Sequence, residues 1–165
     1  CLNTFFEAAE LLKNFPKIKF IIVGEGALRK SFLKKFGHLP NFLYFTSIKK
    51  NQMNSFLSYA DVLYYSTYNS KIYDYGQSAN KIIDYMIASK PIIMSYSGYP
   101  SMVNEANCGY IIPSEDPGAL RDQILKMYNM PRAEISILGT NGRKWLLSNR
   151  KYKNLADKYL KLIFK

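Results

Sequence analysis

Cysteine and histidine are scarce: the 165 residues contain only Cys1, Cys108 and a single histidine, His38. Neither cysteine belongs to a Cys-x-x-Cys pair or has a histidine nearby, which excludes a disulfide framework and a zinc site of the usual spacing. Such usage is typical of the reducing cytoplasm. No apolar run approaches the roughly 20 residues that a spanning helix needs, and no secretory leader pattern is present. We therefore expect a cytoplasmic protein without a zinc site or a membrane span.

Acidic residues are also few, with 12 Asp and Glu against 23 Lys and Arg, a formal charge of +11. The basic residues are denser in residues 29–35 and 143–165. A basic surface attracts polyanions, which leaves nucleic acid, an anionic membrane surface and a phosphorylated small molecule open as partners. It is equally consistent with ordinary solvated helix faces.

The apolar fraction of 48% is enough for one well-packed domain over residues 1–165. Short β-branched and aromatic runs alternate with stretches of helical periodicity. Strands are expected at residues 18–23, 42–45, 62–65, 91–95 and 109–112, the first of them buried on both faces. Helices are expected at residues 2–15, 27–36, 51–59, 80–88, 101–106, 117–128, 135–148 and 151–164. This alternation predicts an α/β, three-layer Rossmann-like domain with a parallel sheet of about six strands and extra C-terminal helices.

The first residue is Cys rather than Met, and it falls inside the first expected helix. We therefore expect this chain to be a piece of a longer protein. In parallel α/β folds, ligands bind where the carboxyl ends of strands lead into helices. The loops at those ends are the places to search for a site.

Gly24-Glu25-Gly26 directly follows the first strand and precedes a helix. Two glycines let a ligand approach the backbone closely, but a dinucleotide fingerprint requires Gly or Ala where this sequence has Arg29. An NAD site is therefore poorly supported. The turn either approaches a ligand or simply makes a tight connection.

The second loop leads through Ser78 into the expected helix at residues 80–88. Ser78 or a close neighbour is expected as the N-cap, so that free amides and the helix dipole form an anion site. On a helical wheel Asn80, Lys81 and Asp84 share one arc with Tyr85 and Ala88, opposite four apolar residues. Asp84 would accept the two ribose hydroxyls and Lys81 would neutralise phosphate. The alternative is a solvated face with an Asp–Lys pair.

The evidence for a functional role is weaker at the other candidate residues. His38 follows a glycine in an expected loop with no carboxylate near it, and we expect it on the surface. Ser66, Ser95 and Ser97 lie near strand ends, but none is in a nucleophile elbow or beside a base. A serine hydrolase is therefore not expected.

Taken in order, several stretches resemble the C-terminal lobe of retaining glycosyltransferases of the GT-B type, family four (glycosyl transferases group 1). The matching stretches are 20–26 (FIIVGEG), 41–46 (NFLYFT), 58–61 (SYAD), 80–93, 98–112 and 113–116. The family's second signature Glu, which binds ribose, corresponds to Asp84. Its first Glu has no clean counterpart, and Tyr73 or Asp74 lies nearest. The form S-x-N-K-x-x-D-Y-M is similar to a subgroup that builds bacterial surface polysaccharides, often from N-acetylamino-sugar donors.

The resemblance implies a donor site for a nucleoside diphosphate sugar, with UDP favoured by family frequency. It implies that the glycine turn and the loop at residues 46–49 border the nucleotide, and that Ser78 and Asn80 lie near the sugar. The donor-binding residues that follow are Gly24, Glu25, Gly26, Ile48, Ser78, Asn80, Lys81 and Asp84. The catalytic residues stay unassigned, because the acceptor site and most catalytic groups of the family belong to an N-terminal lobe. That lobe is absent from this sequence, so we expect this chain to bind donor without transferring sugar.

The partners expected on this basis are the nucleotide sugar, the N-terminal lobe and the inner face of an anionic membrane, but not nucleic acid. Two alternative functions stay open. One is a non-catalytic Rossmann-like module that binds a nucleotide or a protein. The other is a nucleic-acid-binding domain, against which the aromatic residues fall mostly inside expected strands and helices, and no groove-reading motif is present.

Overall fold

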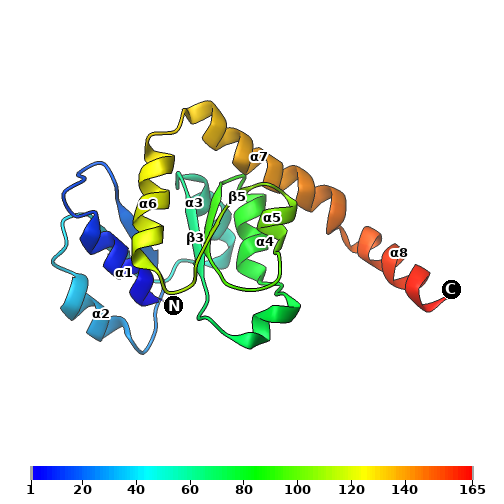
Figure 1. The fold of residues 1–165 in the computed structure, drawn as a ribbon, viewed down its shortest axis with the longest axis horizontal. Coiled ribbons are helices and arrows are strands. Elements are labelled where there is room, and N and C mark those ends of the chain that lie inside the picture. The colour runs from blue at the N-terminus through cyan, green and yellow to red at the C-terminus, as the bar shows by residue number, and fades with distance from the viewer. Residues whose placement is uncertain (1, 165) are drawn as a thin grey trace.

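The computed structural model describes residues 2–164, and strands alternate with helices along them (Figure 1). The strands are β1 (Phe20–Val23), β2 (Phe42–Phe45), β3 (Leu63–Ser66), β4 (Ile92–Ser95) and β5 (Gly109–Ile112). The α-helices are α1 (Leu2–Leu11), α2 (Arg29–Phe36), α3 (Met53–Ser58), α4 (Asn80–Ile87), α5 (Met102–Glu105), α6 (Pro117–Tyr128), α7 (Arg132–Asn149) and α8 (Tyr152–Ile163). Two 3₁₀ helices, η1 (Lys50–Gln52) and η2 (Lys71–Tyr75), precede α3 and α4.

The order of elements agrees with the sequence prediction, and the differences lie at the ends of elements. α1 ends at Leu11 instead of residue 15, because the amide of Phe15 turns back to the carbonyl oxygen of Leu12 at 3.0 Å just before Pro16. The helix expected at residues 51–59 divides into η1 and α3. α7 is longer than expected and begins at Arg132, directly after a proline that suits a helix start.

The strands form two parallel sheets instead of the single sheet of about six strands that we expected. β1 pairs with β2, and β3, β4 and β5 pair in that order. The expectation that the first strand is buried on both faces is wrong, because the side chain of Ile21 is 44% exposed. The crossover connections nevertheless make the α/β, three-layer, Rossmann-like arrangement that the sequence predicts.

Two hydrophobic cores lie on opposite faces of β4, because alternate residues of a strand point to opposite sides. Ile93 belongs to the first core, which contains buried residues of α1, α2 and α6 and of both sheets. Ile92 and Met94 belong to the second core, with buried residues of α4, α5 and α7. Helices therefore cover both faces of the three-stranded sheet.

α7 packs closely on the end of α4 because it presents glycines there. A Cβ atom at Gly139 would lie 2.0 Å from the carbonyl oxygen of Ser89. A guanidinium nitrogen of Arg143 donates to the carbonyl oxygen of Ile87 at 2.6 Å and so satisfies a carbonyl in the last turn of α4. The buried Cys108 borders the same contact, and burial raises the pKa of its thiol to about 11.

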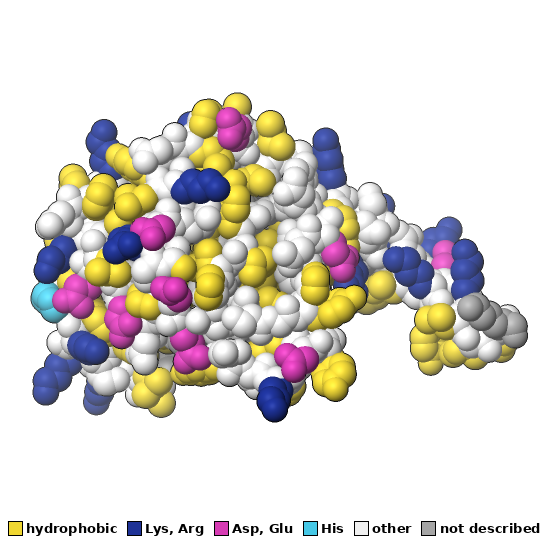
Figure 2. Space-filling model, viewed as in Figure 1, with side chains coloured by type: hydrophobic (Ala, Val, Ile, Leu, Met, Phe, Trp, Pro, Cys, Tyr) yellow, Lys and Arg dark blue, Asp and Glu magenta, His cyan; other side chains and the backbone are white. Residues whose placement is uncertain are grey.

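The last helix, α8, buries none of its side chains and projects from the rest of the molecule (Figure 1). Among residues 2–164, no helix combines the length and the apolar character needed to cross a bilayer. Figure 2 shows Lys and Arg side chains dispersed over the visible face, interspersed with acidic ones, instead of gathered in one broad patch. That face therefore lacks the continuous basic stripe typical of a nucleic-acid-binding surface.

Candidate functional site

The glycine turn after β1 leaves its backbone open. Gly24 has φ +141°, a conformation that side chains rarely adopt, so glycine is required there. A Cβ atom built at Gly24 or at Gly26 would meet no heavy atom within 4 Å. The positive φ of Gly24 fits the interpretation of this turn as a tight connection, and the open space beside both glycines is compatible with the interpretation as a ligand contact. A ligand could therefore approach both residues closely.

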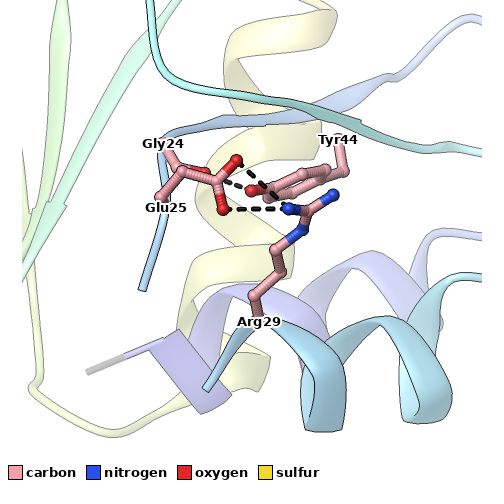
Figure 3. A network of polar contacts seen from close by, with 4 residues as sticks. All are labelled: Gly24, Glu25, Arg29 and Tyr44. Carbon is pink, nitrogen blue, oxygen red and sulfur yellow. Dashed lines mark hydrogen bonds and ion pairs between the residues drawn. The ribbon is translucent and has the colours of Figure 1, made fainter. Parts of the chain in front are cut away.

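A small polar network holds this turn in place (Figure 3). The hydroxyl of Tyr44 in β2 donates to the carbonyl oxygen of Gly24. Arg29, the first residue of α2, donates to both carboxylate oxygens of Glu25, at 2.9 and 3.2 Å. Its guanidinium also lies over the Tyr44 ring, 4.9 Å from the centroid. The turn is thus fixed from the neighbouring strand and from the helix that follows.

Arg29 and Tyr44 are the residues of this network that the sequence did not single out. Arg29 entered as a departure from the dinucleotide fingerprint and as part of the basic segment 29–35, although its spacing of four residues from Glu25 is a signal for an ion pair. The two side chains are 40% and 44% exposed, so the pair contributes little to stability. Its structural effect is to hold a cation beside the open glycine turn.

The start of α4 has no side-chain cap. The N-cap residue is Ala79, the close neighbour of Ser78 that the sequence prediction allowed, and no side chain donates or accepts a capping hydrogen bond there. Ser78, Asn80 and Lys81 are exposed around this helix start. The amide of Ile82 donates to the carbonyl oxygen of Ala79 at 3.0 Å. A helix start without a side-chain acceptor remains available to an external anion.

The polar arc of α4 is narrower than the helical wheel predicts. Asn80, Lys81 and Asp84 are exposed, and Ile82 and Met86 are buried opposite them, as expected. Tyr85 does not belong to the solvated arc, because its side chain packs against the second core. Its hydroxyl donates to the carbonyl oxygen of Tyr64 at 3.3 Å, and burial, with a smaller effect of the Asp84 charge, raises its pKa to about 12.

The loop before α4 is anchored through Tyr73, in η2. The carbonyl oxygen of Tyr73 accepts from the amide of Tyr99 at 2.9 Å and from the hydroxyl of Tyr96 at 3.2 Å. The rings of Tyr73 and Tyr96 pack edge to face, 5.6 Å apart. A Cβ atom at Gly98 would lie 2.6 Å from the same carbonyl oxygen, so only glycine fits there without displacing the loop.

Because of these contacts, the two residues nearest to the position of the family's first Glu lie in different environments. Tyr73 is committed to packing, whereas the carboxylate of Asp74 is exposed. Among the remaining candidates, Ile48 after β2 is half-buried and His38 is exposed, as we expected for the histidine. The buried Ser95 accepts from the Tyr64 hydroxyl at 2.8 Å and is used structurally.

The eight predicted donor residues follow the carboxyl ends of β1, β2 and β3, the side on which ligands bind in such folds. None of them lines either of the two best-defined hollows over residues 2–164. The larger hollow, about 490 Å³, lies between α1 and α2 and includes Leu28, Phe32, Lys35 and Tyr68 in its lining. Within the same residues, no group of three or more His, Cys, Asp or Glu side chains could hold a metal ion.

Comparison with solved structures finds the same fold in a sucrose-phosphate synthase and in two glycosyltransferases. Sucrose-phosphate synthase (tll1590) from Thermosynechococcus elongatus is 17% identical, with a TM-score of 0.73, over 96% of this chain and 41% of that one. WaaG, a glycosyltransferase involved in lipopolysaccharide biosynthesis, is 17% identical, with a TM-score of 0.66, over 95% and 42%. A glycosyltransferase from Rickettsia africae ESF-5 is 14% identical, with a TM-score of 0.71, over 97% and 42%.

The chain thus spans about two fifths of the length of each of these structures. At such low identity the likeness establishes the fold alone. No curated protein matches the sequence. The family model described as glycosyl transferases group 1, however, matches residues 2–130, from the start of α1 to just beyond the end of α6. The chain therefore belongs to the glycosyl transferases group 1 family.

Proposed function

We propose that the full-length protein transfers a sugar, with retention of anomeric configuration, from a UDP-linked donor to a polysaccharide or lipid-linked acceptor. In this proposal the present chain is the C-terminal, donor-binding lobe. The observation that carries it is the start of α4, which no side chain caps and which has Lys81 in its first turn and Asp84 one turn later, all exposed. Family membership supports a nucleotide-sugar donor.

The chemistry required of such a lobe is mainly electrostatic. When the sugar leaves, negative charge builds up on the diphosphate, and preorganised donors aimed at that charge lower the barrier. The unpaired amides at the start of α4 and the ammonium group of Lys81 would act in this way. Asp84 would accept hydrogen bonds from both hydroxyls of the ribose, since each of the two carboxylate oxygens is an acceptor.

The glycine turn provides the second half of the proposed site. Because Gly24 and Gly26 face open space, their backbone can contact the nucleotide, and Ile48 would border the base. Arg29 adds a cation that the Glu25 carboxylate and the Tyr44 ring hold at this edge. Ser78 and Asn80 would face the sugar.

We place the acceptor site and the acid–base chemistry in a second lobe of the full-length protein, and we expect the reaction to need neither a metal nor a cofactor. The isolated chain should then bind donor and transfer nothing. The charge of +11 supports action at the inner, anionic face of a membrane. If this is correct, binding to vesicles that contain phosphatidylglycerol weakens as salt is raised. Lack of any association at low salt would exclude the membrane part of the proposal.

Substitution of Asp84 tests the ribose contact directly. Asp84→Ala should weaken UDP binding by about 1–3 kcal/mol, which is roughly 5- to 150-fold in Kd. Isothermal titration calorimetry of the folded variant measures this. Asp157→Ala is a matched control, because it removes an exposed carboxylate from α8, and it should leave the affinity unchanged. Equal affinities for UDP in both variants would refute the role of Asp84.

Titration with other ligands separates the transferase from its rivals. UDP and UDP-sugars should bind more tightly than single-stranded RNA of similar charge. A preference for RNA would favour a nucleic-acid-binding domain instead. A full-length protein that binds UDP-sugars but neither transfers nor hydrolyses the sugar would favour a non-catalytic nucleotide-binding module.

A further inference from the structure

Two tyrosines are exposed at the edge of the three-stranded sheet where the donor is proposed to bind. Tyr75, the last residue of η2, is 95% exposed, and Tyr99, in the loop after β4, is 62% exposed. Ile72 of η2 is exposed as well. Because β3 and β4 are parallel neighbours, the loops that follow them leave the sheet at the same edge. Single exposed apolar side chains are ordinary, whereas a group of them beside a candidate site indicates a contact surface.

Tyr99 differs from an ordinary surface tyrosine because the backbone on both sides of it is held. Its amide donates to the carbonyl oxygen of Tyr73 at 2.9 Å. The residue before it is Gly98, where a Cβ atom would lie only 2.8 Å from the Cβ atom of Tyr73. Two residues after it, the hydroxyl of Ser101 accepts from the amide of Val103 at 3.2 Å and caps α5. The ring of Tyr99 is therefore presented from a fixed position.

The ring of Tyr99 lies beside Gly76, in the loop that leads to α4. A Cβ atom built at Gly76 would lie 3.7 Å from Cδ1 of this ring, which is contact distance. Gly76 also has φ +91°, a conformation that favours glycine. Because glycine has no side chain, it brings the loop beside the ring without covering the ring.

This arrangement places the ring close to the proposed donor site. Gly76 is three residues before Ala79, the N-cap of α4, so the Cα atoms of these two residues are at most about 11 Å apart. In the proposed site Asp84 holds the ribose and the start of α4 holds the diphosphate. The sugar then lies on the side of the diphosphate away from Asp84. Ser78, which is proposed to face the sugar, belongs to the same short stretch of chain as Gly76.

A tyrosine ring suits the C–H groups that one face of a pyranose presents. The face of an aromatic ring carries partial negative charge, which attracts the partly positive hydrogens of those groups. The contact also removes apolar area of both partners from water. Tyrosine has only two side-chain torsions to fix, so the entropy cost of the contact is small.

We propose that Tyr99 is a specificity-determining residue whose ring packs against the C–H face of the sugar in the bound donor. The inference rests on the proposed function, because it takes the diphosphate to lie at the start of α4. It assigns the contact with the sugar ring to the loop after β4, whereas the nucleotide is held by α4 and by the glycine turn after β1.

The test is isothermal titration calorimetry with UDP, UDP-glucose and UDP-N-acetylglucosamine as probes. Tyr99→Ala should raise the Kd of both UDP-sugars roughly 2- to 12-fold, the range expected for an aromatic contact. It should leave the Kd of UDP unchanged, because the amide of residue 99 and the start of α4 are retained. Tyr99→Phe keeps the ring and should bind all three probes like the parent.

Tyr59→Ala is the matched control. Tyr59 is 86% exposed, but it ends α3 just before β3, at the opposite edge of the sheet. This variant should bind UDP and both UDP-sugars with the affinities of the parent.

The outcomes separate this inference from the proposed function. A parent chain that does not bind UDP would refute both. If the parent binds UDP, unchanged affinity of Tyr99→Ala for both UDP-sugars would overturn the sugar contact alone, and would favour a contact of Tyr99 with a second lobe. An equal loss for UDP and the UDP-sugars would also overturn it, because Tyr99 would then act on the nucleotide or on the fold. A loss confined to the UDP-sugars, absent in Tyr99→Phe, supports it.

Discussion

Replacement of Gly98 by alanine tests whether the loop before α4 is held by a single close contact. The Cβ atom that Gly98→Ala adds would lie 2.6 Å from the carbonyl oxygen of Tyr73, 2.7 Å from the Tyr96 hydroxyl and 2.8 Å from the Tyr73 Cβ atom. These distances are too short for any of the three atoms to stay in place. The substitution should therefore displace η2 from the loop after β4.

The cost can be worked out from the contacts that are lost. Besides a bond from the Gly76 amide at the end of η2, the Tyr73 carbonyl oxygen accepts two hydrogen bonds from the segment after β4, from the Tyr99 amide and the Tyr96 hydroxyl, and these two would be lost. At about 0.5–1.5 kcal/mol each, their loss destabilises the folded state by about 1–3 kcal/mol. For a chain of this size a loss of about 2 kcal/mol lowers the Tm by roughly 4–8 °C. Because η2 leads into α4, we also expect weaker UDP binding in the proposed site.

Gly26→Ala is the matched control, because a Cβ atom there meets nothing within 4 Å. Its Tm, measured by circular dichroism under the same conditions, should stay within about 2 °C of the parent, which corresponds to a surface change of about 0.5 kcal/mol. A Gly98→Ala variant as stable as Gly26→Ala, with unchanged UDP affinity, would refute the reasoning.

Three further predictions concern stability. Gly139→Ala should lower the free energy of unfolding by about 1–3 kcal/mol in urea melts, because its Cβ atom would overlap the Ser89 carbonyl. Helix propensity alone predicts that the same substitution raises this free energy by about 1 kcal/mol, so the sign of the measured change distinguishes the two effects. Asp116→Ala removes the carboxylate that caps α6 and should cost about 1 kcal/mol, whereas Asp116→Asn should retain most of it. Burial raises the pKa of Tyr85 to about 12 and that of Cys108 to about 11. The stability that each neutral side chain contributes is therefore fully present below its unfolded pKa, 10.0 or 9.0, and is lost as pH rises through its folded pKa. Unfolding free energy should accordingly fall above about pH 9, and less steeply in Tyr85→Phe.

Local sequence patterns predicted the elements of the fold because each depends on neighbours along the chain. The apolar spacing of Ile82 and Met86 predicted which face of α4 is buried, and both side chains are buried. Gly24 after a β-branched run predicted a turn, and its positive φ explains the residue. The predicted ends of elements were less accurate. At α1, for example, the position of the end depends on single hydrogen bonds in the turn that follows.

The composition of the candidate site was only partly predictable. Lys81 and Asp84 are exposed on α4, as the helical period requires. The prediction that Tyr85 lies on the exposed arc was wrong. A tyrosine suits either a solvent-exposed or a buried position, and only its contact with β3 selects the buried one. Arg29 and Tyr44 escaped notice because the network joins residues from a helix and a neighbouring strand.

The sequence by itself determined that this is a parallel α/β protein of the glycosyl transferases group 1 family, since strand and helix periods and motif order are local properties. Only the tertiary structure decided that the strands form two sheets that share the first hydrophobic core, that Gly98 lies against Tyr73, and that α8 buries none of its side chains. Each of these depends on contacts between segments distant in the chain, or on their absence. Such contacts leave no periodic pattern from which they could be inferred.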